Sequence, residues 1–328
     1  MLHPAEHIAP SLVHQAKTRI AVLIPCFNEE AAIPQVVAGF RQALPESLIF
    51  VYDNNSRDRT VDVARAAGAL VRNEPLQGKG NVVRRMFSDV DADVYVLVDG
   101  DATYDPQSAR EMVNRLVAEE LDMVVGSRVS RDQSAAYRRG HQFGNVLLTG
   151  FVARLFGNRF TDVLSGYRVF SKRFVKSFPA LAKEFETEIE LTVHALELGM
   201  PVAEVATPYA SRPDGSASKL RTYRDGLSIL RTIMRLYKNE RPFAFFGSTA
   251  VALFLFSVGL AWPLLVTYME TGLVPRFPTA ILVTGMIILA FLSLACGLIL
   301  DTVTQGRREA RRLAYLAFKP APSENGQQ

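Results

Sequence analysis

Cysteine and tryptophan are scarce in this chain of 328 residues, which has two cysteines and one tryptophan. Cys26 falls where a strand is expected to end, and Cys296 falls in a long uncharged segment, so we expect no disulfide between them. This excludes a small secreted fold held together by disulfides. Residues 1–18 are mixed and polar and lack the apolar core of a signal peptide, so we expect an N-terminal tail on a cytoplasmic domain.

Charge is missing from two long stretches. Residues 243–269 and 277–300 contain no Asp, Glu, Lys or Arg. Each exceeds the about 20 apolar residues that cross a bilayer as a helix. Basic residues precede the first stretch and follow the second, and the positive-inside rule then places both flanks in the cytoplasm. We therefore expect a multi-pass protein of the inner (cytoplasmic) membrane, with both termini cytoplasmic and a basic tail over residues 301–328.

The net charge is a modest +4, which fits contact with lipid headgroups or phosphorylated substrates and argues against a nucleic-acid partner. Residues 220–241 carry apolar side chains at helical spacing with basic residues between them. Such a helix either packs on a domain surface or lies in a membrane interface. The uncharged stretches that follow favour a juxtamembrane helix.

Between residues 19 and 209, short apolar strands alternate with helices. The predicted strands are 20–25, 48–52, 69–72, 94–98 and 123–126, and the predicted helices are 29–43, 60–67, 79–89 and 108–119. This order predicts an α/β fold, with a mostly parallel, Rossmann-like sheet covered by helices on both faces. Ligands of such sheets bind beyond the carboxyl ends of the strands.

Several polar residues fall at those ends, including Asp53 and Arg128. The strongest signal is Asp99 and Asp101, which follow an apolar strand with only Gly100 between them. Carboxylates are hard ligands that suit Mg²⁺ or Mn²⁺, and an ion held there would neutralise a departing diphosphate. A solvated turn would have the same residue types.

Six motifs occur in a fixed order along the chain: IPCFNEE (24–30), DNNS (53–56), GKG (78–80), DGD (99–101), DVLSGYRVF (162–170) and GSASKL (215–220). Together they resemble the family 2 glycosyltransferases of the GT-A fold. The last two resemble the branch of dolichol-phosphate mannose synthases and bacterial polyprenyl-phosphate glycosyltransferases. The resemblance places the GT-A domain at residues 19–219.

The resemblance implies a role for each matching residue. Donor-binding residues would be Pro25, Phe27, Glu29, Asp53, Asn54, Lys79, Asp99, Arg212 and Lys219. Contacts to the acceptor phosphate would come from Arg128, Arg138, Arg139, Ser165 and Arg168. The metal would bind Asp99 and Asp101, and these acids with Arg128 would be catalytic. Glu186, Glu188 and Glu190 are interpreted as structural, since an ionised phosphate acceptor needs no general base, and His194 as a packed side chain.

The predicted function is a metal-dependent, inverting hexosyltransferase that uses a nucleotide sugar and a polyprenyl phosphate in cell-envelope glycan modification. The resemblance favours a UDP-sugar, with GDP-mannose as the other candidate. One alternative is a polysaccharide or glycolipid synthase with a sugar hydroxyl acceptor, which usually carries a Gln-x-x-Arg-Trp motif; Trp262 lies within an apolar stretch instead. Another is a catalytically silent membrane scaffold. A homo-oligomer and a flippase partner are both compatible with the chain.

Overall fold

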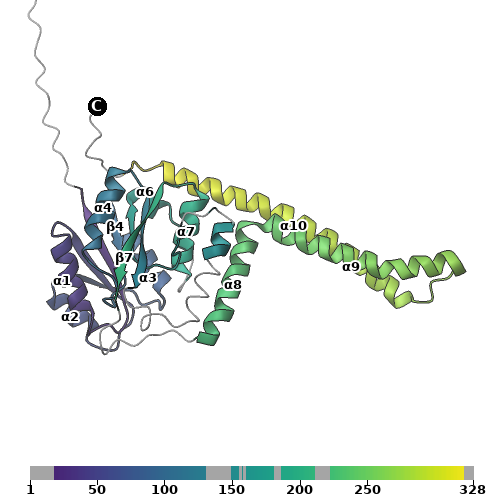
Figure 1. Ribbon diagram of the computed structural model, residues 1–328, viewed down its shortest axis with the longest axis horizontal. Coiled ribbons are helices and arrows are strands. Elements are labelled where there is room, and N and C mark those ends of the chain that lie inside the picture. Colours follow the sequence, from purple (N-terminus) through teal and green to yellow (C-terminus); the bar gives the residue numbers. More distant parts are fainter. Residues whose placement is uncertain are drawn as a thin grey trace, which may run out of the picture.

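The computed structural model describes residues 18–130, 149–154, 157, 160–180, 186–210 and 222–320. A seven-stranded sheet, in the order β3-β2-β1-β4-β6-β5-β7, forms its centre (Figure 1). The strands are β1 (Ile20–Cys26), β2 (Leu48–Asp53), β3 (Leu70–Asn73), β4 (Val94–Leu97), β5 (Met123–Ser130), β6 (Arg168–Ser171) and β7 (Val202–Tyr209). The helices packed around it are α1 (Ile33–Ala43), α2 (Thr60–Ala66), α3 (Lys79–Asp89), α4 (Ser108–Ala118), α6 (Lys172–Ser177) and α7 (Thr187–Glu197).

The sheet is buried on both faces because strand side chains alternate between two apolar cores. In β1, Leu23 belongs to the core shared with α3, α6 and α7, whereas Val22 and Ile24 belong to the core shared with α1, α2 and α4. All three side chains are fully buried. The predicted α/β sheet with helices on both faces is therefore confirmed.

The topology contains one feature that the sequence did not predict. Strand β6 lies between β4 and β5 and runs antiparallel to both, whereas the other strand pairs are parallel. Because β5 is antiparallel to β6, it keeps the direction of β4. The carboxyl ends of β1, β2, β4 and β5 therefore meet at one edge of the sheet, which we call the polar edge.

Backbone geometry at the polar edge is unusual. Asn28, Asn55 and Ala102 have φ angles of 53°, 66° and 58°, in the left-handed region that few non-glycine residues adopt. Each lies in a turn just beyond a strand. The predicted helix 29–43 starts only at Ile33, because the residues before it form this turn. Such conformations concentrate at functional turns, where surrounding contacts hold them.

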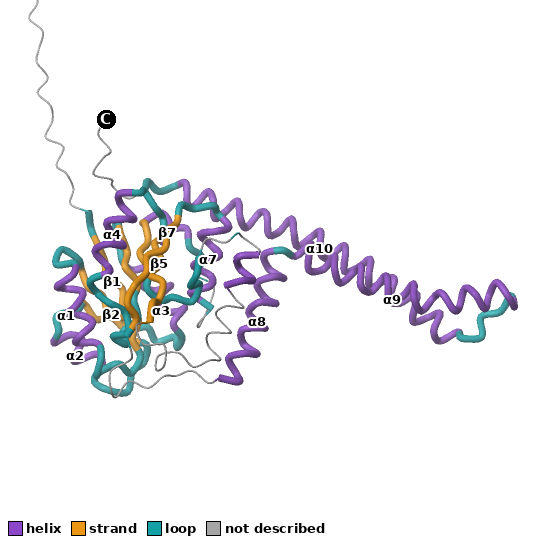
Figure 2. Tube along the Cα trace, in the orientation of Figure 1, coloured by secondary structure: helices purple, strands orange, loops and turns teal. Residues whose placement is uncertain are grey.

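Three helices follow the sheet domain: α8 (Thr222–Glu240), α9 (Pro242–Thr271) and α10 (Phe277–Leu316). Helices α9 and α10 pack together as a hairpin that projects from the sheet domain (Figures 1 and 2). Both are long and apolar enough to cross a membrane, and only 11% and 17% of their most apolar windows are buried. Gly272, with φ 67°, ends α9 in a left-handed cap.

The end of the chain differs from the tail expected over residues 301–328. Helix α10 continues without a break to Leu316, and its final turns return to pack on α6 (Figure 1). The second apolar helix is therefore also part of the sheet domain's surface. Residues 1–17 and 321–328, which belong to the expected tails, lie outside the described residues.

Candidate functional site

The polar edge brings together residues that are far apart in the sequence. Cys26 and Asp53, the last residues of β1 and β2, are register partners, and the Asn54 amide donates to the Cys26 carbonyl over 2.9 Å. Gly100 lies against the same strand end, since a Cβ atom there would be 2.7 Å from Cys26 Sγ. Only glycine fits between the two acids of the DGD motif without a shift of its neighbours.

One carboxylate oxygen of Asp53 is hydrogen-bonded within the described residues and the other is not. Its Oδ2 accepts from the Ser56 amide over 3.1 Å, while Oδ1 is buried and has no hydrogen-bond partner among the described residues. Buried polar atoms are nearly always paired, so a ligand N–H or O–H would complete this one. Pro25 and Phe27 are half-buried on the adjoining strand end, and Glu29 is buried beside them.

Asn54, expected to bind the donor, instead supports the loop before α3. Its Nδ2 donates to the carbonyls of Glu74 and Leu76, both over 2.8 Å. Its Oδ1 accepts from the Gly78 amide over 2.7 Å. Both ends of the side-chain amide are thus occupied by the chain itself. Asn54 acts on the site by fixing the position of Lys79, which follows Gly78 at the start of α3.

The two acids after β4 have different surroundings. Asp101 is 5% exposed, and its Oδ1 accepts from the Thr103 amide over 3.2 Å and from the Thr103 hydroxyl over 2.6 Å. The strained turn at Ala102 keeps this arrangement. Asp99 is more exposed, at 29% of its side chain, and its Oδ1 accepts from the Lys79 ammonium.

Lys79 lies between two carboxylates. Its Nζ donates to Asp99 Oδ1 and to Glu188 Oε1, so Glu188 is a residue of the site. Burial lowers the pKa of an ammonium, but the charges of Asp99 and Glu188 outweigh that effect and raise the pKa of Lys79. A Cβ on Gly166 would lie 2.5 Å from Asp99 Oδ2, so the loop that contains Gly166 also contacts Asp99.

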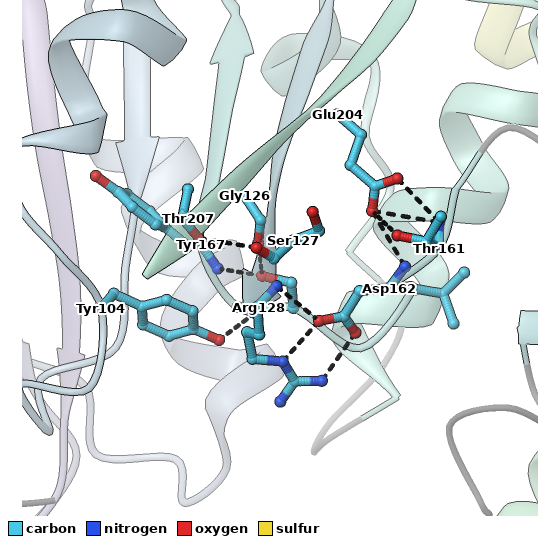
Figure 3. Close-up of polar contacts among 12 residues, drawn as sticks. Tyr104, Gly126, Ser127, Arg128, Thr161, Asp162, Tyr167, Glu204 and Thr207 are labelled. Atoms are coloured by element: carbon cyan, nitrogen blue, oxygen red, sulfur yellow. Dashed lines mark hydrogen bonds and ion pairs between the residues drawn. The ribbon is translucent and has the colours of Figure 1, made fainter. Parts of the chain in front are cut away.

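A second ion pair stands at the end of β5 (Figure 3). Arg128 donates from Nε and Nη2 to the two carboxylate oxygens of Asp162, over 2.6 and 2.8 Å. Burial alone raises the pKa of the Asp162 carboxyl, but its hydrogen bonds and charge attraction with Arg128 lower it overall. Glu204 accepts from the amides of Thr161 and Asp162 and so anchors this loop to β7. Arg128 also lies 5.6 Å from the ring centre of Tyr209.

Two expected acceptor contacts prove to be buried. Arg168 is 0% exposed and donates to the Ser165 and Val163 carbonyls and the Thr192 hydroxyl, over 2.9, 2.7 and 2.8 Å. Ser165 is also 0% exposed, and its hydroxyl donates to the Gly126 carbonyl. Neither is open to a lipid phosphate here, because the antiparallel β6, which the sequence did not predict, places Arg168 inside the sheet domain. We correct both assignments to structural roles.

The remaining predicted residues divide into two groups. Arg138, Arg139, Arg212 and Lys219 lie outside the described residues. His194 is buried as expected, with Nε2 3.0 Å from the Ser177 hydroxyl, and burial lowers its pKa to about 3. It is a packed side chain of α7.

The described acids offer hard oxygen ligands but not a complete metal cage. No group of three or more His, Cys, Asp or Glu gathers within the described ranges. Asp99 and Asp101 fit Mg²⁺ or Mn²⁺ as hard oxygen ligands, and they would hold such an ion together with substrate oxygens and water. This pairing suits an ion that binds together with a diphosphate.

The comparisons with known proteins identify the family of this chain. The Glycosyl transferase family 2 profile matches residues 21–178. Glycosyltransferase AglJ of Haloferax volcanii is 32% identical over 243 residues, covering 74% of this chain and 80% of that protein. The chain belongs to glycosyltransferase family 2, and it is a glycosyltransferase.

Other relatives cover different shares of the chain. Protein RfbJ of Shigella flexneri is 57% identical over 123 residues, 38% of this chain and 95% of that protein. A dolichyl-phosphate hexose transferase of Haloferax volcanii is 27% identical over 222 residues, 68% of this chain and 95% of that protein. Among solved structures, glucosyl-3-phosphoglycerate synthase of Mycobacterium tuberculosis, in complex with Mn²⁺, UDP and its product, aligns with TM-score 0.56 and 23% identity, over 68% of this chain and 80% of that one. This last likeness confirms the GT-A-like fold.

Proposed function

We propose that this glycosyltransferase moves a hexose from a nucleotide sugar to a polyprenyl phosphate, with inversion at C1. The observation that carries the proposal is the connection between the site and the hairpin. Arg235 of α8 lies 2.7 Å from Glu186, two residues before Glu188, and α8 leads directly into α9. A site tied in this way to a membrane-crossing hairpin suits an acceptor whose phosphate lies at the membrane surface. The relative named dolichyl-phosphate hexose transferase supports the same acceptor class.

The polar edge would bind the donor. Asp53 Oδ1, which has no partner in the part of the chain that the structure describes, would accept from the nucleoside, beside Pro25, Phe27 and Glu29, and Lys79 would contact the diphosphate. Glucosyl-3-phosphoglycerate synthase, which has a similar fold, was crystallised with UDP and Mn²⁺, and this supports a UDP-sugar as the donor. Mg²⁺ or Mn²⁺ bound with Asp99 and Asp101 would neutralise charge on the departing diphosphate.

The transfer itself requires positioning more than proton transfer. A phosphate oxygen of the acceptor would attack C1 in line, and the bond from C1 to the diphosphate oxygen would break, with its electron pair leaving on the nucleoside diphosphate. Because the acceptor phosphate is already ionised, no general base is needed. Arg128, held in one orientation by Asp162, would neutralise the acceptor and aim it at the sugar.

The same proposal fixes the membrane arrangement, with the sheet domain and both termini on the cytoplasmic side of the inner membrane. Cysteines introduced one at a time at positions 271 and 323, in a Cys296→Ala background that leaves only the buried Cys26, test it with a reagent that does not cross membranes. From outside intact cells, position 271 should be labelled and position 323 should not. Labelling at position 323 first would reverse the topology.

The direct test supplies membranes containing the protein with labelled nucleotide sugars and a polyprenyl phosphate, then extracts the lipid. We expect label in the lipid fraction from one donor, released by mild acid as expected for a glycosyl phosphate. Membranes carrying Asp101→Ala are the control and should give none. Label that enters only a free sugar or a glycan would show that the acceptor is a hydroxyl and would overturn the proposal.

A further inference from the structure

Lys79, Asp99 and Glu188 form a cluster built from three separate segments of the chain. Lys79 is the first residue of α3, Asp99 follows β4, and Glu188 lies in the first turn of α7. Their side chains are 17%, 29% and 8% exposed, and the ammonium donates to both carboxylates. A largely buried lysine held by two acids at the polar edge is an arrangement typical of a residue with a role in the chemistry there.

The two carboxylates hold the ammonium from different directions. Asp99 is the more exposed acid and lies at the place where the metal would bind. Glu188 is the more buried acid, with a side chain 8% exposed against 29% for Asp99, and the Thr192 hydroxyl donates to its backbone carbonyl. Glu188 is therefore the inner partner of Lys79, and Asp99 is the partner that a ligand can reach.

The ammonium and a divalent cation would compete for Asp99. Lys79 already occupies Oδ1 of that carboxylate, and two cations on one oxygen repel each other. The cation can take Asp99 only if Lys79 keeps a second anion to hold it. Glu188 supplies that anion within hydrogen-bond distance.

We propose that Lys79 is a built-in counter-ion that occupies Asp99 before the donor and metal arrive, and that Glu188 is the positioning residue that retains Lys79 when they bind. This inference rests on the donor site of the proposed function but not on its acceptor. It assigns to Glu188 a role that goes beyond packing and requires no proton transfer.

The test measures Mn²⁺ binding by electron paramagnetic resonance, with and without UDP, on the full-length protein in detergent. Lys79→Met should tighten Mn²⁺ binding without UDP by about 3- to 10-fold, since the competing charge is gone, and should weaken UDP binding. Glu188→Gln should weaken Mn²⁺ binding by a similar factor, because Lys79 then depends on Asp99 alone. Glu111→Gln, on the exposed side of α4, should change neither.

A shorter acid separates positioning from a general charge effect. Glu188→Asp keeps the charge but withdraws the carboxylate beyond hydrogen-bond reach of Lys79. If Glu188 acts by holding Lys79, this variant should behave like Glu188→Gln, and it should have no effect when added to Lys79→Met. The double variant Lys79→Met/Glu188→Gln removes both charges and remains usable if Lys79→Met alone fails to fold.

The outcomes are distinct. Mn²⁺ affinity at the wild-type level in Glu188→Asp, or weaker Mn²⁺ binding without UDP in Lys79→Met, would overturn the inference. If the wild type binds Mn²⁺ and UDP as expected but never glycosylates a polyprenyl phosphate, only the proposed acceptor fails. If the wild type binds neither Mn²⁺ nor UDP, the proposed donor site is wrong, and the counter-ion role of Lys79 is overturned as well.

Discussion

Two partly buried ionic clusters in this protein have the same residue types but different roles. The site cluster, Lys79, Asp99 and Glu188, lies at the polar edge. The docking cluster lies at the opposite edge, where the end of α10 meets the sheet domain: Glu197 with Arg308 and Arg311, and Asp122 with Arg173 and Tyr315. Helix α7 joins the two clusters, since Glu188 and Glu197 are at its two ends.

The acids at the two edges differ in how completely they are satisfied, as Asp122 and Asp53 show. Asp122 is fully buried and accepts from the Ser171 hydroxyl, Arg173 and the Tyr315 hydroxyl, while Arg173 lies 4.9 Å from the Tyr315 ring centre. At the polar edge, Asp53 Oδ1 has no described partner. A saturated acid such as Asp122 holds structure together, whereas an unsatisfied acceptor at a strand end, such as Asp53 Oδ1, suits a ligand. Residue type alone does not distinguish them.

The largest expected effect is on the site side. Asp101→Ala should reduce transfer by at least about a hundredfold, because charge neutralisation at the departing diphosphate is worth several kcal/mol. EDTA should likewise stop the wild-type enzyme. The matched control is Asp91→Ala, a 57% exposed acid at the far edge, which should keep its activity. Near wild-type transfer by Asp101→Ala, with metal dependence intact, would remove Asp101 from the metal site.

The docking side should respond in stability rather than in chemistry. Glu197→Ala leaves two partly exposed arginines without their anion and should lower the free energy of unfolding by about 2–3 kcal/mol, less than for a fully buried pair. Thermal unfolding in detergent measures this. Glu119→Ala breaks an exposed pair with Arg115 and should cost under about 0.5 kcal/mol. Equal losses in the two variants would mean that α10 is not held by Glu197.

A smaller effect should separate the acceptor from the donor within the site. Arg128→Ala should raise the KM for polyprenyl phosphate about tenfold and that for the nucleotide sugar much less, since the lost contact is to the acceptor. Steady-state kinetics with both substrates varied provides the measurement, and Arg85→Ala, half-exposed on α3, is the control. A change confined to the nucleotide-sugar KM would move Arg128 to the donor side.

The smallest effect concerns pH at the docking side. Burial, followed by the charge of Glu197, raises the pKa of Glu240 from 4.5 to about 7. A raised pKa in the folded state means that its stabilising contribution is complete below about pH 4.5 and is lost as the pH rises through 7. Glu240→Gln should therefore flatten the fall in melting temperature between about pH 5 and pH 8, which is roughly the titration range of this carboxyl group. An unchanged pH profile would place the ionisation elsewhere.

Much of the fold followed from local pattern. Apolar runs between polar turns predicted five of the strands and their parallel arrangement, because strands covered on both faces need continuous apolar sequence. Strands β6 and β7 were not predicted, and β6 was missed because its residues include Arg168, whose charge does not suggest a buried strand. Because of strand β6, Ser165 and Arg168 lie in the interior of the sheet domain and not at the predicted acceptor site.

The sequence by itself determined the features that depend on neighbouring residues alone. These are the acids that follow β4, Asp53 at the end of β2, and two helices whose apolar surfaces are too extensive to face water. Tertiary structure decided which charges meet. Lys79 and Glu188 are 109 positions apart, and Arg311 and Glu197 are 114 apart, so no local pattern pairs them. The physical reason is that a buried ion is stable only beside its counter-ion, and the packing of the whole chain selects that counter-ion.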